Sequence, residues 1–138
     1  MSGKKLVESW FKNIDSQDFE AVGELMADEH TFHSPMSPTP IKAIEHLDMM
    51  WTMSDSFSGI HLLDQVIEDG NNVVVRGRWA GKHTREYHGI PASGKKVEFS
   101  WIDIFEIVDG KVVNEYFEMD PTSIIEQITN INTQKTQS

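Results

Sequence analysis

Apolar residues in the first third of the chain recur every three or four positions, which is the spacing of one face of an α-helix. This spacing predicts three amphipathic helices, over residues 6–14, 19–26 and 41–53. Residues 34–40 contain three prolines, and each proline fixes φ and removes a backbone donor. We therefore expect a loop between the second and the third helix.

From Ile60 onward the period changes to two, which is typical of strands with one buried face. The alternation predicts four strands, over residues 60–68, 73–87, 97–108 and 111–119. Gly and Asn residues in segments 69–72 and 109–110 accept the positive φ of tight hairpin turns. Strands that follow each other in the sequence should therefore pair where these turns join them.

Asp120 and Pro121 mark the start of a closing helix, because Asp favours the N-cap and Pro the first helical position. Helices first and an antiparallel meander afterwards are typical of an α+β fold. We expect residues 1–138 to form one domain, a cone-shaped curved antiparallel or mixed sheet wrapped around the N-terminal helices, with residues 1–4 and 132–138 frayed. The open end of such a cone leaves a cavity, which is the expected place of function.

The composition of the chain excludes several classes of partner and of chemistry. It has 12 Lys and Arg against 22 Asp and Glu, a net charge of −10, which repels nucleic acid and anionic membranes. It has no cysteine, which excludes disulfides and thiol chemistry, and no apolar run near the ~20 residues that span a bilayer. Glu8 and Lys12 interrupt the apolar segment that would have to serve as a signal peptide, so we expect a cytoplasmic protein.

Two motifs in the second half of the chain carry a family resemblance. Residues 81–84 read G-K-H-T and residues 89–95 read G-I-P-A-S-G-K, and the chain resembles the SnoaL-like polyketide cyclase (ester cyclase) family. The resemblance implies the nuclear transport factor 2-like fold, a cystatin-like α+β roll, and a cofactor-free aspartate that drives an intramolecular aldol closure of an ester. Asp120 matches the acid–base residue of the family. The family's Trp four residues earlier is Tyr116 here.

Asp120 and His83 are the predicted catalytic residues. A carboxylate at the mouth of a pocket can take a proton from carbon beside a carbonyl, although Asp120 could instead serve only as a helix N-cap. His83 shares a strand face with Trp79, so it points into the cone if Trp79 does. There it could bind a carbonyl or pass a proton. A purely structural hydrogen bond is the alternative for His83.

The expected pocket is aromatic. The predicted substrate-binding residues lie on inward stripes or at the mouth of the cone: Trp10, His33, Trp79, Trp101, Asp103, Phe105 and Tyr116. The position of Asp103 resembles the protonated acid with which ketosteroid isomerase binds its oxyanion, but Ser34 stands where that enzyme has its aspartate base. His30 and His33 lie close in sequence without a motif such as H-E-x-x-H, so no metal is predicted.

These features support two hypotheses about function. The first is a cofactor-independent, cyclase-like enzyme that acts on a small hydrophobic ester or carbonyl compound, with Asp120 as base and His83 assisting. The second is a non-catalytic module that binds a small hydrophobic ligand. The sequence contains no glycine-rich phosphate-binding motif, so we expect no cofactor.

The outer face of the predicted sheet also points to a partner. It should carry the apolar residues Val74, Ala80, Ile102 and Ile104. An open sheet with such a face usually finds cover, and nuclear transport factor 2-like proteins commonly pair through it. We therefore expect a homodimer.

Overall fold

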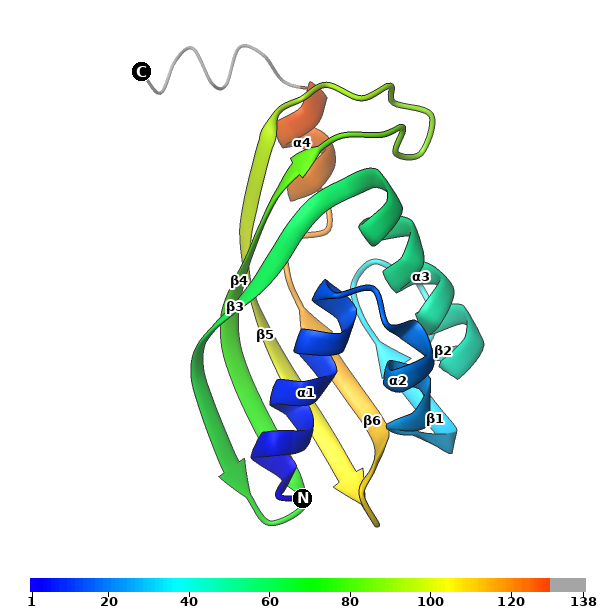
Figure 1. Ribbon diagram of the computed structural model, residues 1–138, viewed down its shortest axis with the longest axis vertical. Coiled ribbons are helices and arrows are strands. Elements are labelled where there is room, and N and C mark those ends of the chain that lie inside the picture. The colour runs from blue at the N-terminus through cyan, green and yellow to red at the C-terminus, as the bar shows by residue number, and fades with distance from the viewer. Residues whose placement is uncertain (130–138) are drawn as a thin grey trace.

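A six-stranded sheet with helices packed on its concave side forms the body of the protein (Figure 1). The computed structural model describes residues 1–129. In chain order the elements are α1 (Gly3–Asp15), α2 (Phe19–Glu24), β1 (Met26–His33), β2 (Ile41–Lys42), α3 (Ala43–Ser56), β3 (Phe57–Asp69), β4 (Asn72–His83), β5 (Lys96–Val108), β6 (Lys111–Glu118) and α4 (Ser123–Thr129).

The sheet is mixed, and its strand order is β2-β1-β6-β5-β4-β3. All neighbouring strands run antiparallel except β1 and β6, which are parallel. The sheet curves around α1, with α3 beside that helix and α4 at the far end (Figure 1). This arrangement confirms the predicted α+β class and the curved sheet around N-terminal helices. None of the described helices is long and apolar enough to cross a membrane.

The core lies between α1 and the inner face of the sheet. The apolar stripe predicted for the first helix is buried in full, and its members are Leu6, Val7, Trp10, Phe11 and Ile14. The inner face of the long strands adds Val75 and Trp79 from β4 and Trp101 and Phe105 from β5. Both strands alternate between buried and exposed positions, which is the period that the sequence shows.

Glycines let two tryptophan rings lie flat on the sheet. A Cβ placed on Gly77 would lie 2.6 Å from Cζ2 of Trp101, and a Cβ on Gly81 would lie 2.6 Å from Cη2 of Trp79. Real Cβ atoms do not approach other atoms so closely, so these positions require glycine. The ring of Trp101 can therefore lie over the neighbouring strand β4, and the ring of Trp79 lies over Gly81 of its own strand and Gly59 of β3.

Residues 25–33 differ most from the sequence-based prediction. The second helix ends at Glu24 instead of residue 26, and Met26–His33 form strand β1, which was not predicted. Strand β1 pairs in parallel with β6, more than eighty residues away, so no hairpin signal accompanies it. Its inner face carries His30 and Phe32.

Other element ends differ by a few residues. Helix α3 spans Ala43–Ser56 instead of 41–53, because Ile41 and Lys42 pair with β1. Strand β4 ends at His83 instead of Tyr87, because the next backbone amides, those of Thr84 and Arg85, donate to the carbonyl of Ser56.

The predicted fraying of the N-terminal residues does not match the structure. Gly3 and Lys4, which the sequence predicts to fray, lie in the first turn of α1, and their amides donate to the carboxylate of Glu68. Residues 132–138, also predicted to fray, lie outside the described residues.

Candidate active site

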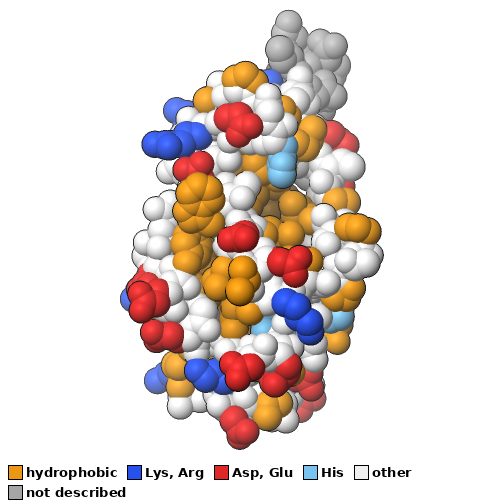
Figure 2. Space-filling model, turned by 90° about the vertical axis from the view of Figure 1, so that its right-hand side faces the viewer, with side chains coloured by type: hydrophobic (Ala, Val, Ile, Leu, Met, Phe, Trp, Pro, Cys, Tyr) orange, Lys and Arg blue, Asp and Glu red, His pale blue; other side chains and the backbone are white. Residues whose placement is uncertain are grey.

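A cavity of about 450 Å³ lies between α1, α3 and the inner face of the sheet. Its walls combine polar side chains with aromatic rings from α1 and the strands and with four methionines, Met36, Met49, Met50 and Met53. Figure 2 shows a hollow in this side of the molecule with hydrophobic side chains at its floor. The volume and the walls are those of a site for a small organic molecule.

Two carboxyl groups are buried together in the wall of this cavity. Asp103 on β5 is fully buried and Glu115 on β6 is 2% exposed. They lie diagonally opposite on neighbouring strands, since the register pairs Asp103 with Phe117 and Phe105 with Glu115. The two groups lie close enough to influence each other's ionisation, and both oxygens of Asp103 and Oε1 of Glu115 have no hydrogen-bond partner among the described residues. Among the described residues, no Lys or Arg forms an ion pair with either carboxyl group.

Burial changes the acidity of both carboxyl groups. Loss of hydration raises the pKa of Asp103 well above its ordinary value, and the nearby charge of Glu115 raises it further. Burial also raises the pKa of Glu115, to about 7, against a smaller opposite effect of the neighbouring Asp103 carboxyl group. Asp103 is therefore the member of the pair that keeps its proton, and Glu115 is the member that can lose one near neutral pH.

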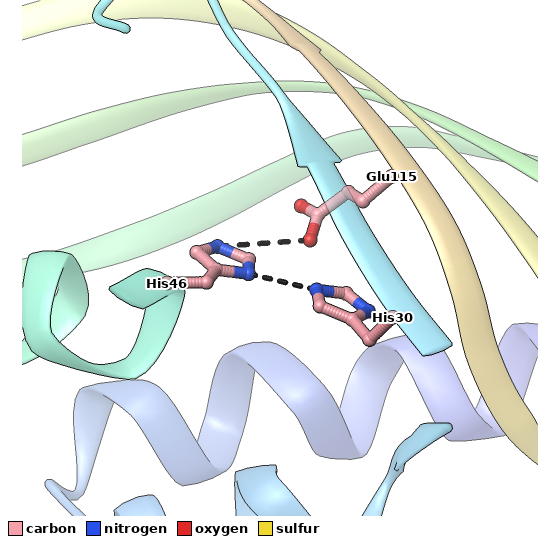
Figure 3. Close-up of side chains that lie close together, drawn as sticks. All are labelled: His30, His46 and Glu115. Carbon is pink, nitrogen blue, oxygen red and sulfur yellow. Dashed lines mark hydrogen bonds and ion pairs between the residues drawn. The ribbon is translucent and has the colours of Figure 1, made fainter. Parts of the chain in front are cut away.

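Two buried histidines extend this cluster. In Figure 3, His30 and Glu115 project from the strands β1 and β6, and His46 reaches toward both from α3. The Nε2 atom of His30 lies 3.0 Å from Nδ1 of His46, and Nε2 of His46 lies 3.8 Å from Oε1 of Glu115. Burial lowers the pKa of both histidines. His46 lines the cavity, whereas His30 lies behind it.

The indole of Trp10 adds a free hydrogen-bond donor. Trp10 lies on α1 against the histidines, with its ring centroid 6.0 Å from that of His46. The Nε1–H group is buried and has no partner among the described residues, although the side chain lines the cavity. Because an indole N–H can only donate, this group is available to an acceptor atom of a bound ligand.

A second acid–histidine pair lies elsewhere in the cavity wall. The ring Nδ1–H of His61 donates to Oδ1 of Asp15 over 2.7 Å, and the backbone N–H of His61 donates to Oδ2 over 3.0 Å. These two bonds tie the end of α1 to β3. They also fix the ring, which leans on Phe11 with 4.9 Å between centroids.

The structure places three of the predicted site residues in the cavity wall, namely Trp10, Trp79 and Asp103. Trp101 and Phe105 are buried in the adjoining core, where Phe11 covers both. The remaining four predicted residues, His33, His83, Tyr116 and Asp120, are not among the residues that line the cavity.

Tyr116 and His33 lie on the other side of the sheet. Their rings stack on each other with 4.3 Å between centroids, and Tyr116 is 43% exposed. Phe32, which precedes His33, and Phe117, which follows Tyr116, line the cavity instead. Alternation along β1 and β6 therefore turns the predicted pair away from it.

Asp120 is exposed and lies before α4. Its Oδ1 accepts hydrogen bonds from the backbone N–H and the hydroxyl of Thr122, at 3.0 and 2.9 Å. These bonds lower the pKa of Asp120 below its ordinary value. The helix begins at Ser123, so Asp120 closes a turn ahead of the helix instead of occupying the predicted N-cap.

His83 is fully buried at the end of β4. Its Nδ1 accepts a hydrogen bond from the backbone N–H of Ser93 over 3.1 Å and lies 2.9 Å from the Ser93 hydroxyl. Its ring stacks on Phe57. These contacts tie the loop after β4 to the strand. A catalytic role for His83 stays a prediction.

Three members of the cluster were missed as site residues, namely His30, His46 and Glu115. A signal existed for His46, because it lies four positions before the buried Met50 on the helical stripe that faces inward. A signal also existed for His30, because it lies two residues before the buried Phe32. Their approach to Glu115 depends on the pairing of β1 with β6, which the sequence analysis did not predict.

A curved, unclosed mixed sheet around N-terminal helices is the fold of the nuclear transport factor 2-like class of proteins. Within that class, the family model of the SnoaL-like polyketide cyclases matches residues 4–128, and the chain belongs to this family. The resemblance seen in the sequence motifs is thereby confirmed.

Solved structures agree on the fold. AclR from Streptomyces galilaeus, a candidate hydroxylase, superposes with a TM-score of 0.83 at 15% identity, over 93% of this chain and 96% of its own. A candidate SnoaL-like polyketide cyclase from Jannaschia sp. CCS1 gives 0.81 at 21% identity, over 94% and 96%. An LEH-like epoxide hydrolase from M. tuberculosis gives 0.72 at 14%, over 98% and 96%. A comparison with curated proteins found no significant match.

Proposed function

We propose that this protein is a cofactor-independent enzyme that removes a proton from carbon beside a carbonyl in a small hydrophobic ester, and so promotes an aldol-type ring closure. The observation that carries this proposal is the buried Asp103–Glu115 pair in the wall of the cavity. A carboxyl group with a pKa near the working pH is an efficient proton acceptor and donor. The membership in the SnoaL-like family supports the same class of reaction.

Glu115 and Asp103 have different parts in this reaction. The carboxylate of Glu115 takes the proton from the substrate carbon, and the enolate carbon then forms a bond to a second carbonyl carbon of the same molecule. The oxygen of that carbonyl takes the proton back from Glu115, so no other reactant is consumed. Asp103 keeps its proton, and it can donate a hydrogen bond to the enolate oxygen, as can the indole N–H of Trp10.

The methionines of the cavity favour the second hypothesis, a module that only binds a hydrophobic ligand. Unbranched thioether side chains adapt to ligands of different shape and contribute no proton chemistry. In that case the carboxyl pair would contribute to binding alone. Both functions use the same cavity. They differ in whether removal of the Glu115 acid abolishes turnover.

A substitution on β6 distinguishes these functions. We expect Glu115→Gln to bind aromatic polyketide-like esters as the parent does, measured by tryptophan fluorescence, and to lose turnover roughly 10²- to 10⁴-fold. Glu118→Gln, an exposed change on the same strand, is the control and should match the parent. Parental turnover in Glu115→Gln would contradict the proposed chemistry, and an absence of turnover on all esters that bind would favour the binding module.

The proposal includes a homodimer that pairs through the outer face of the sheet. Cross-strand pairing joins Ile67, Val74, Ile104 and Tyr116 into one apolar row across four strands. Ile67, Ile104 and Tyr116 in this row are between 38% and 49% exposed. A second copy of the chain would cover such a face by the same residues.

A further inference from the structure

The hydrogen bonds of the buried histidines fix where their protons lie. The Nδ1 atom of His30 lies 3.0 Å from the carbonyl oxygen of Val112, which can only accept, so Nδ1 carries the proton. In the neutral ring Nε2 of His30 is then an acceptor, and Nδ1 of His46, 3.0 Å away, must donate to it. The proton of neutral His46 therefore lies on Nδ1, and its Nε2 lone pair lies toward Glu115.

The geometry of the two rings favours a hydrogen bond over a metal centre. The ligand atoms of His30, His46 and Glu115 lie within 4.8 Å of one another, as a metal site would require. However, the histidine rings are coplanar within 3°, with 5.2 Å between centroids and 3.0 Å between the facing nitrogens. The rings therefore meet end to end, and the lone-pair directions of the two facing nitrogens lie along one line. A metal site would need both directions to converge on one metal ion, ~2.1 Å from each nitrogen.

Packing holds His46 in this orientation. Phe32 stacks on the ring of His46 with 3.7 Å between centroids and 17° between planes. The indole of Trp10 packs against the ring of His30. The titratable groups around His46 are His30 from β1, Glu115 from β6 and Asp103 beside Glu115 on β5. The ring thus has one fixed donor bond, to His30, and one free lone pair next to the carboxyl pair.

We propose that His46 is a further acid–base residue of this cavity, which exchanges a proton with Glu115, and that His30 is the positioning residue that fixes its tautomer. This inference rests on the proposed function. In the exchange the O–H bond of Glu115 breaks and an N–H bond forms at Nε2 of His46, while its Nδ1–H stays bonded to His30. The exchange produces one carboxylate and one imidazolium, whose charges cancel. The net charge of the buried cluster therefore does not change.

The exchange needs a small movement. The 3.8 Å between Nε2 and Oε1 exceeds hydrogen-bond reach, which is about 2.6 to 3.2 Å. The exchange therefore requires the two side chains to move closer, and such contacts commonly tighten when substrate binds. The exchange gives Glu115 the ionised form that the proposed reaction uses, and His46 holds the proton in the meantime.

The tautomers can be read directly from the ring ¹⁵N signals of the whole protein by NMR, without any substrate. We expect the parent at neutral pH to carry the proton of His46 on Nδ1 and to show an unprotonated Nε2. His30→Gln keeps an oxygen acceptor for this proton and should keep the tautomer, whereas His30→Leu removes the acceptor and should shift the proton to Nε2. His33→Gln, a change at the stacked histidine on the outer side of the sheet, is the control. A parent His46 protonated on Nε2 overturns the proposal, even if His30→Leu fails to fold.

Two further measurements test the exchange itself. Glu115→Gln removes the carboxylate that accompanies the imidazolium, so His46 should stay neutral to a lower pH than in the parent, and an unchanged titration overturns the exchange. Added Zn²⁺ should leave the signals of His30 and His46 in place, and a stoichiometric shift of both would assign a metal site instead. These readouts need no turnover. Full turnover in Glu115→Gln would therefore refute the proposed function separately from the proton exchange.

Discussion

Within residues 1–129 no Lys or Arg forms an ion pair with the buried Glu115, so its protonation must be linked to the stability of the fold. Its pKa in the folded protein, about 7, lies above the ordinary 4.5. The folded state therefore binds the proton more tightly than the unfolded state does. The free energy of unfolding that depends on this group is full at low pH and falls as pH rises from the unfolded to the folded pKa.

This linkage predicts the pH dependence of a variant. Glu115→Gln keeps the size and shape of the side chain but cannot ionise. Between about pH 5 and pH 8 the parent should lose stability relative to this variant, by up to roughly 3 kcal/mol. Urea unfolding at several pH values measures the difference, with Glu118→Gln as the exposed control. Parallel stability curves for parent and Glu115→Gln would contradict the raised pKa.

Asp120 offers a second test at the scale of one residue. Asn at this position keeps an acceptor for the two bonds from Thr122 and deletes the acid, whereas Ala deletes both. We expect Asp120→Asn to match the parent in urea unfolding and Asp120→Ala to unfold at a lower urea concentration, because only Ala loses the acceptor of both bonds. Because Asp120 lies outside the cavity wall, the Asn variant should also keep turnover. Loss of most turnover in Asp120→Asn would instead confirm the role that the family resemblance implies.

The sequence predicts best those elements whose pattern lies within a short stretch of the chain. The buried stripe of α1 and the two hairpins follow from spacing and turn residues within a short window. Strand β1 lacks such a window, because acidic and polar residues interrupt its apolar face and its partner β6 is distant. Asp103 was found because it lies between two aromatics on one strand face. The cluster of His30, His46 and Glu115 could not be predicted in the same way, because its members come from three separate elements, β1, α3 and β6.

The close approach of β4 to the Trp101 ring gives a prediction at this scale. Gly77→Ala would place a Cβ 2.6 Å from both Cζ2 of Trp101 and the carbonyl oxygen of Leu62, and neither can move cheaply. We expect a loss of roughly 1 to 3 kcal/mol in urea unfolding. Gly23→Ala on α2 is the control, because its Cβ would meet only Leu47 at 3.5 Å. A Gly77→Ala variant as stable as the parent would contradict this packing.

At the scale of the whole molecule, the cone has two faces with different tasks. The concave side holds the cavity, and the outer side presents the apolar row that includes Ile104. The fold itself does not select the reaction, since structural neighbours include a candidate hydroxylase, candidate cyclases and an epoxide hydrolase. The choice of chemistry belongs to the side chains in the cavity.

The outer face predicts the state of association. We expect light scattering at micromolar concentration to give about twice the chain mass of 15.7 kDa, as a homodimer requires. Ile104→Lys should shift the protein to monomers, because a buried lysine would lack a partner. Ile44→Lys, a change at an exposed position on α3, should leave the dimer intact. A parent that is only monomeric would remove this prediction.

The central claim is that the buried carboxyl pair takes a proton from carbon. Hydrogen–deuterium exchange at the carbon beside the carbonyl of a bound ester, followed by NMR in D₂O, measures that step even where no ring closes. The parent should exchange this proton faster than buffer alone, and Glu115→Gln should lose roughly 10²- to 10⁴-fold of the enzyme-dependent rate. Equal exchange by the parent and Glu115→Gln, with the ester bound to both, would contradict the account.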